Sequence, residues 1–196
     1  METRHLAGFR EYLNTAYERS VFERALAAQD LWDCHLHTHR MARLRVTADL
    51  IHDLQVDVEG EGPEDLPKLH VKLLYPATQA AAAASLIKLD PRVRAQGLKP
   101  TLSPAARHHV KNKSLFVLMK DRDVMFFTLL EGEIVRGIIG DFSRYDVTVN
   151  LKGGLPVVVL RHSIYDLRNK QGRCYLKSFQ DTHRDWQKSE YFVPSR

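Results

Sequence analysis

The sequence predicts an α+β protein that is mainly antiparallel β-sheet, and three observations lead to that prediction. Apolar residues at helical spacing are confined to the N-terminal stretch and a few short segments. Apolar and polar residues alternate in short stretches between residues 43 and 167, as in strands with one buried face. Glycine-containing turns separate these stretches. Short antiparallel strands behind a helix are typical of a small, bent β-barrel.

The elements of the first half follow from these patterns in order. Apolar residues spaced by three and four over residues 6–26 predict one amphipathic helix of about 25 residues. Alternation then predicts three strands, at residues 43–47, 53–58 and 69–73. Thr78 is a suitable N-cap for a short helix over residues 80–89.

In the second half, Ser103 followed by Pro104 predicts another helix start, because proline is well tolerated at the first helical position. Four extended stretches follow, at residues 124–130, 134–145, 147–151 and 157–167. Gly137 and Gly140 interrupt the second stretch, which predicts a sharp bend or a close approach of backbones there.

The composition of the 196-residue chain, with 44% hydrophobic and 27% charged residues, is ordinary for a globular protein. No apolar run approaches the roughly 18 residues of a membrane helix, and the N-terminus lacks the pattern of a secretory signal. Cys34 and Cys174 are far apart, so we expect reduced thiols rather than a disulfide framework. These features predict a soluble, cytoplasmic protein without a membrane partner.

Charge is distributed unevenly along the chain. Residues 1–90 contain 10 Lys/Arg and 14 Asp/Glu, whereas residues 91–196 contain 19 and 10. The densest basic stretch comprises Arg92, Arg94, Lys99, Arg107, Lys111, Lys113, Lys120 and Arg122. Only Asp121 opposes it, and part of it is expected on the helix that begins at Ser103. Such a stretch attracts polyanions, although it is also typical of a solvated surface.

A weak internal repeat indicates that the barrel unit occurs twice. The matching residues are Asp33 with Asp123 and Thr38 with Thr128, each 90 apart, and Leu66-Pro67 with Leu155-Pro156, 89 apart. In both copies a helix precedes the first strand. We therefore divide the chain into a degenerate copy (1–90), a second copy (91–168) and an added strand with a tail (169–196).

Two blocks of the second copy, Leu130–Phe142 and Val158–Ile164, resemble the two characteristic blocks of Sm-like proteins. The Arg161-His162 pair makes the bacterial Hfq-type RNA chaperones the more similar group. The resemblance covers residues 104–167, with a weaker echo over residues 20–76. It implies an N-terminal helix on a bent five-stranded barrel, and a ring of six such folds. Two copies per chain would complete that ring as a homotrimer.

The resemblance also implies a site for single-stranded, uridine-rich RNA and a role in RNA-mediated regulation. The implied RNA-binding residues are Tyr145, Arg161, His162, Lys111, Asn112, Lys120 and Arg122. Tyr145 would stack on a base, and Arg161 and His162 would contact phosphate or a base edge. Lys120 and Arg122 would form part of a basic outer rim. The alternative to RNA binding is that Tyr145 is a core aromatic and His162 an ordinary strand residue with its hydrogen bonds satisfied.

The sequence departs from the family at several positions. Thr128 and Ile134 replace the residues that read adenines on the opposite face of the ring, so binding of A-rich tails is not expected. In the first copy, the counterparts of Gly132, Gly137 and Arg161-His162 are taken to be Ala42, Thr47 and Lys72-Leu73. The acidic first copy is therefore expected to be a scaffold that completes the assembly.

Two other functions remain open at this point. The chain could be an Sm-like scaffold that binds proteins and not RNA. It could also be a metal-dependent hydrolase, because Asp33-Cys-His-Leu-His-Thr-His39 resembles the Asp-x-His-x-His opening of amidohydrolases. His35, His37 and His39 alternate along a predicted strand and would share one face, close enough for a metal.

The rest of the chain favours a protein that is not an enzyme and has no cofactor or metal. Those hydrolases are parallel barrels that need further ligands on later strands. No phosphate-binding loop or nucleophile elbow is present in the sequence. Beyond the second copy, residues 173–179 are expected to add a strand, and the tail mixes aromatic and basic residues that suit either RNA or docking onto the domain.

Overall fold

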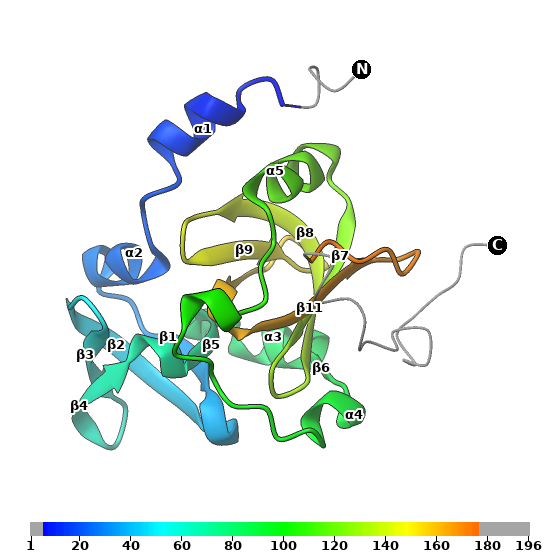
Figure 1. The fold of residues 1–196 in the computed structure, drawn as a ribbon. Coiled ribbons are helices and arrows are strands. Elements are labelled where there is room, and N and C mark those ends of the chain that lie inside the picture. Colours follow the sequence, from blue (N-terminus) through cyan, green and yellow to red (C-terminus); the bar gives the residue numbers. More distant parts are fainter. Residues whose placement is uncertain (1–5, 177–196) are drawn as a thin grey trace.

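A computed structural model describes residues 6–176 (Figure 1). The described helices are α1 (Phe9–Thr15), α2 (Val21–Ala28), α3 (Ala80–Leu86), α4 (Pro91–Arg94) and α5 (Asn112–Asp121). The strands are β1 (Trp32–Leu36), β2 (Met41–Asp49), β3 (Asp53–Val58), β4 (Gly62–Pro67), β5 (Val71–Pro76), β6 (Lys88–Leu89), β7 (Val124–Leu129), β8 (Glu133–Phe142), β9 (Asp146–Asn150), β10 (Pro156–Leu160) and β11 (Ile164–Asn169). The prediction of a mainly antiparallel β protein with a few helices is confirmed.

The strands form one 11-stranded antiparallel sheet in the order β11-β7-β8-β9-β10-β5-β1-β2-β3-β4, with β6 paired to β8. The sheet is open, because its two end strands, β4 and β11, do not pair with each other. Each half consists of four strands in a meander and a fifth strand that returns to pair with the first, after a 3₁₀ turn (Lys68–His70 or Arg161–Ser163). The pairing of β10 with β5 joins the two halves.

The two halves repeat one another with a constant separation of 93 residues. Trp32 pairs with Leu44 in the first half, and Met125 pairs with Gly137 at the corresponding place in the second. The same shift relates the other ladders, including the irregularity in β2 after Val46 and that in β8 after Ile139. The conserved separation across every ladder indicates one structural unit present twice.

The separation of 90 residues expected from sequence is wrong by three. Under the observed register, Thr38 corresponds to Glu131 rather than to Thr128. The two Leu-Pro pairs are not equivalent either, because Leu66-Pro67 ends β4 whereas Pro156 begins β10. The identities that do align include Asp53 with Asp146, Gly60 with Gly153 and Pro63 with Pro156.

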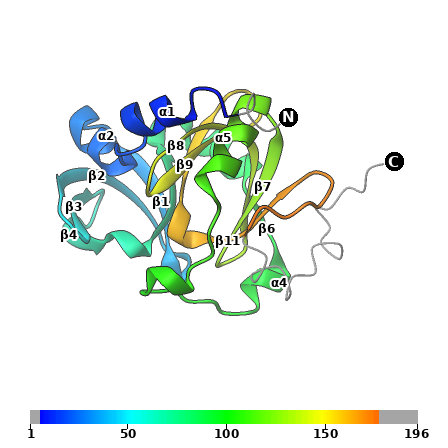
Figure 2. The same ribbon diagram turned by 45° about the horizontal axis from the view of Figure 1, so that its top comes forward.

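The predicted N-terminal helix is two helices rather than one. Ser20 begins a new helix, α2, because its hydroxyl oxygen accepts a hydrogen bond from the N–H of Glu23 at 3.2 Å. α1 lies beside α5 on the second half, where Phe9 and Tyr12 pack against Phe116, while α2 covers the first half (Figure 2). The periodicity continues through the break because both helices pack an apolar face against the protein, α1 with partly buried side chains and α2 with buried ones.

Two further predicted elements differ from the observed ones. Ser103 and Pro104 start only a 3₁₀ turn, Pro104–Ala106, and the helix expected there begins at Asn112. The single strand expected at residues 157–167 is β10 and β11, separated by the turn Arg161–Ser163. The turn redirects the chain, so that β10 pairs with β9 and β5 while β11 pairs with β7.

The buried apolar residues form two clusters, one in each half. Strand β10 contributes Val158 and Leu160 to the first cluster, and β5 contributes Leu73 and Tyr75 to the second. Strands β5 and β10, which pair with each other, therefore each contribute side chains to the core of the opposite half. No helix within residues 6–176 has the length and apolar character needed to cross a bilayer.

Candidate nucleic-acid interface

Tyr145 lies in the turn between β8 and β9, and its side chain is 51% exposed. The buried Ser143 fixes the turn, because its hydroxyl accepts hydrogen bonds from the N–H groups of Tyr145 (3.0 Å) and Asp146 (3.1 Å). The guanidinium of Arg144 lies 5.9 Å from the centre of the Tyr145 ring. The turn thus exposes the Tyr145 ring next to the Arg144 guanidinium, and hydrogen bonds to Ser143 hold its backbone in place.

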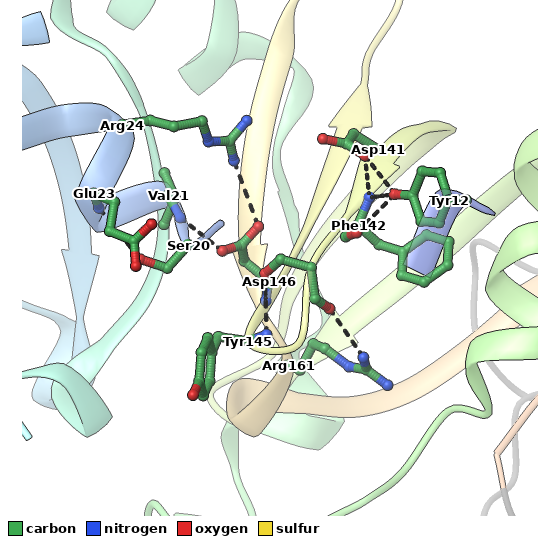
Figure 3. Close-up of polar contacts among 11 residues, drawn as sticks. Tyr12, Ser20, Val21, Glu23, Arg24, Asp141, Phe142, Tyr145, Asp146 and Arg161 are labelled. Carbon is green, nitrogen blue, oxygen red and sulfur yellow. Dashed lines mark hydrogen bonds and ion pairs between the residues drawn. The ribbon is translucent and has the colours of Figure 1, made fainter. Parts of the chain in front are cut away.

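Arg161 supports this turn from the inside (Figure 3). Its backbone N–H donates to the carbonyl of Tyr145 at 2.8 Å. Its guanidinium donates to the carbonyls of Ser143 (3.1 Å) and Val110 (2.8 Å) and to Oδ1 of Asn112 (2.9 Å). Burial lowers the pKa of Arg161. Figure 3 shows the Tyr145 ring and the guanidinium extending to opposite sides of the turn.

His162 points away from Tyr145 and toward the first half. Its Nε2 lies 2.9 Å from the carbonyl oxygen of Val71, so the neutral ring donates this hydrogen bond. Burial lowers the pKa of His162 to about 4. At neutral pH the ring is therefore an uncharged part of the contact between the halves, and the structure does not bring it together with Tyr145.

The remaining predicted residues lie at the two ends of α5. Lys111 is exposed at the start of the helix, next to Asn112, whose Nδ2 donates to the Tyr17 hydroxyl at 2.9 Å. Lys120 and Arg122 lie at the other end, about 15 Å away for a helix of this length. The ammonium of Lys120 donates to the carbonyl of Ala7 at 3.1 Å. The first end of α5 is joined to the Tyr145 turn through Arg161 and also through Tyr17, whose carbonyl accepts the N–H of Arg144 at 2.8 Å.

Two residues that sequence reasoning missed attach the N-terminal helices to the Tyr145 turn (Figure 3). The buried carboxylate of Asp146 accepts the N–H of Val21 at 2.8 Å and lies 3.5 Å from Arg24. Burial raises its pKa. The Tyr12 hydroxyl contacts Asp141 and donates to the carbonyl of Phe142 at 2.7 Å. Helical spacing in the sequence predicts the helices but not these partners, which lie more than 100 residues away.

The first half contains a contact equivalent to the one between Arg161 and Ser143, but different residues lie at the surface. Lys68 occupies the position of Arg161, and its ammonium contacts the carbonyl of Leu50, the counterpart of Ser143. It also lies 2.5 Å from the Asp49 carboxylate. The expected correspondence of Lys72-Leu73 with Arg161-His162 is therefore wrong. His52 takes the place of Tyr145.

The three histidines of the hydrolase-like motif do not share a strand face, so that expectation is wrong. Strand β1 ends at Leu36, and Thr38 and His39 have left-handed backbones with φ of 65° and 59°. His35 instead lies 3.1 Å from the Tyr75 hydroxyl. His37 and His39 flank the carboxylate of Glu131, at 3.6 and 3.4 Å.

Glu131 is the centre of an ionic contact between the halves. Its carboxylate accepts the backbone N–H groups of Thr38 (2.7 Å) and His39 (3.1 Å), and the fully buried Lys72 contacts both Glu131 and Glu133. Ligand atoms of His39, Glu131 and Glu133 lie within 4.8 Å of one another, which is a spacing compatible with a metal. The single Lys72 ammonium offsets one of the two carboxylate charges. Oε2 of Glu133 and both ring nitrogens of His37 are buried without a hydrogen-bond partner among the described residues.

Other expectations fall on the sheet and on the C-terminal segment. Thr128 and Ile134 are buried within β7 and β8. In place of the added strand expected at residues 173–179, the structure has two isolated bridges, Cys174 with Arg168 and Leu176 with Val110. Residues 177–179 lie outside the described part of the chain, as do the tail aromatics Trp186, Tyr191 and Phe192. Comparison with known proteins finds no matching family model, no similar curated protein and no similar solved structure.

Proposed function

We propose that this chain is a cytoplasmic, non-enzymatic protein that binds single-stranded, uridine-rich RNA in the manner of an Hfq-type chaperone and serves RNA-mediated regulation. The observation that carries the proposal is the half-exposed Tyr145 ring on a turn whose backbone is fixed from beneath. A rigid exposed aromatic is the surface that an unstacked base requires. Arg144 and Lys111 supply positive charge for the phosphates.

The fold supports the same interpretation. Each half has a helix followed by five strands, as the Sm-like resemblance implies, and the fifth strand returns to pair with the first. We propose a small Sm-like barrel for each half on this basis. The charge difference between the halves favours the second as the RNA-binding half.

In this proposal the residues expected to bind RNA have different roles. Tyr145 stacks, and Arg144 and Lys111 contact phosphate. Arg161 acts as a positioning residue, because three hydrogen bonds already engage its guanidinium. His162 is neutral and binds Val71. Lys120 and Arg122, at the far end of α5, add a more distant cationic surface for a longer RNA.

Binding of a labelled uridine 15-mer, followed by fluorescence anisotropy, tests the proposal. Stacking on one aromatic contributes about 1–3 kcal/mol. Tyr145→Ala should therefore weaken binding by roughly 5- to 150-fold, since about 1.4 kcal/mol corresponds to a tenfold change. Tyr145→Phe should bind as the unchanged protein does.

The matched control for this experiment is His52→Ala, which changes the corresponding position of the acidic first half. This variant should retain full affinity. Equal losses for Tyr145→Ala and His52→Ala, or no loss for either, would contradict a base-stacking role for Tyr145.

An exposed apolar turn in the first half favours a second candidate function, a scaffold that binds protein. Leu50 is 48% exposed and Ile51 is 86% exposed, between β2 and β3. A double Leu50→Ser, Ile51→Ser variant should lose a protein partner and keep RNA affinity if both functions are present. Loss of RNA affinity in this variant would place RNA on the first half instead.

A further inference from the structure

The two edges of the sheet differ in how they are covered. Within residues 6–176, strand β4 pairs with β3 alone, whereas the outer side of β11 carries a short segment of the same chain, residues 173–176. The N–H of Tyr175 donates to the carbonyl of Leu167 at 3.0 Å, and the N–H of Asn169 donates to the carbonyl of Arg173 at 3.2 Å. Leu176 also bridges to Val110. Figures 1 and 2 show β4 and this segment at opposite ends of the molecule.

The internal repeat shows what would otherwise lie against β11. Strand β5 is the counterpart of β11, and its outer side pairs with β10 through Leu74 and Val158. The counterpart of Leu74 is Leu167, the residue that Tyr175 contacts. The segment 173–176 therefore occupies on β11 the place that a neighbouring unit occupies on β5.

The edge strand β4 is the counterpart of β10, and it contains residues equivalent to those with which β10 pairs to β5. Asp65 and Leu66 correspond to Val158 and Val159, which pair with β5. Pro63 corresponds to Pro156, so a proline at this position is compatible with such pairing. The first half is acidic and the second is basic, which favours contact between unlike halves of two chains.

We propose that residues 173–176 cap the edge of β11 at which the β4 strand of a second copy of this chain would bind, and so prevent head-to-tail assembly. A head-to-tail contact closes into a ring or grows into a filament, depending on its rotation. The homotrimer expected from the resemblance would close through these same edges. The capped chain is a monomer, and release of the cap exposes a binding edge.

The cap is tested in the full chain by light scattering after size exclusion, over a range of concentrations. The unchanged protein should have the mass of one chain, 22.6 kDa. Tyr175→Pro removes the N–H that donates to Leu167 and should shift the mass to at least two chains. Tyr175→Ala keeps that N–H and should remain a single chain. Gly172→Val, at a turn with φ of 80°, provides an independent way to displace the cap.

The partner edge is tested by adding Glu64→Pro or Asp65→Pro to Tyr175→Pro. Successive N–H groups of a strand point to opposite sides, so one of these changes removes an outward donor of β4. At least one should restore the single-chain mass. The proposal is overturned if the unchanged protein forms multiples while the Tyr175 amide is protected from hydrogen exchange. It is also overturned if both cap variants remain folded single chains, or if neither β4 change reverses assembly.

Discussion

Asp146 illustrates how one buried carboxylate can determine where an exposed residue lies. It joins the turn that carries Tyr145 to the first N–H of α2 and to Arg24. Leaving a buried N–H without an acceptor costs about 1–3 kcal/mol. Asp146→Ala should lower the free energy of unfolding by that amount in urea titrations. The control Asp57→Ala, at an exposed strand position, should change it by less than about 0.5 kcal/mol.

His162 makes the stability depend on pH in a defined direction. Its folded-state pKa of about 4 lies below the ordinary value of 6.5, so the unfolded chain binds more protons between these values. The free energy of unfolding should therefore fall as the pH drops from 6.5 to 4, with a slope of up to about 1.4 kcal/mol per pH unit from this residue. Burial lowers the pKa of His35 and His37 as well, which adds to the same trend.

Urea titrations at pH 7 and pH 5 measure this effect. His162→Gln removes the titrating group and should lose less stability between the two pH values than the unchanged protein. An equal loss in both proteins would show that His162 is not the group that takes up the proton.

The exposed aromatic at residue 145 is predictable from the sequence, whereas the roles of its neighbours are not. The resemblance places Arg161 and His162 at the site because the second block, Val158–Ile164, carries a basic residue followed by a histidine. Their partners, Val110 and Val71, lie about 50 and 90 residues away along the chain. Local sequence gives no information on such distant contacts. Arg161 and His162, which were expected to contact RNA, instead form hydrogen bonds within the protein.

At the scale of elements, Gly137 shows why the two copies diverge in sequence while keeping one register. A Cβ at Gly137 would lie 2.3 Å from the carbonyl oxygen of Asn150, yet its counterpart in β2 is Leu44. The close approach of β8 and β9 is therefore a property of the second half alone. Of the two alternatives expected from the glycines, a sharp bend or a close approach of backbones, the close approach is confirmed at Gly137.

Gly137→Ala should consequently destabilise the protein by about 1–3 kcal/mol, the usual cost of forcing extra atoms into a packed site. Gly60→Ala is the control, because no atom lies within 4 Å of its Cβ position and only its φ of 81° opposes the change. It should cost about 1–2 kcal/mol, the usual cost of a left-handed backbone for a residue with a Cβ. Thermal unfolding of both variants measures the difference, and a larger loss for Gly60→Ala would contradict the close approach.

Element ends were harder to predict than element types, for a physical reason visible at the histidine motif. Alternation continues to residue 39, but the strand stops at Leu36. The turn that follows has two left-handed residues, and both of their N–H groups donate to the Glu131 carboxylate. A partner from the other half, rather than the local pattern, stabilises this conformation.

At the scale of the whole molecule, the duplication was predicted but its register was not. Chance identities at a separation of 90 residues outweighed the true matches, such as Asp53 with Asp146, because only backbone pairing is conserved throughout. The pairing of the strands fixes the separation of the two copies at 93 residues, which the sequence alone did not reveal. The same comparison identifies Lys68 as the counterpart of Arg161.

The junction between the halves combines strand pairing with a buried ionic cluster. Only two residue pairs join β10 to β5, and Lys72 with Glu131 and Glu133 adds a polar contact beside them. Removing one member of a buried ion pair is costly because the others are left uncompensated. The cluster therefore fixes the two halves in one arrangement, with the Tyr145 turn and the N-terminal helices on a common frame.

Photo-cross-linking of a 4-thiouridine-containing RNA to the full chain, with the modified peptides identified by mass spectrometry, tests the central claim most directly. The account predicts that the main cross-linked peptide contains Tyr145, and that unlabelled uridine-rich RNA competes for it. Cross-links confined to the first half, or a Tyr145 peptide that stays unmodified at saturating RNA, would contradict the account.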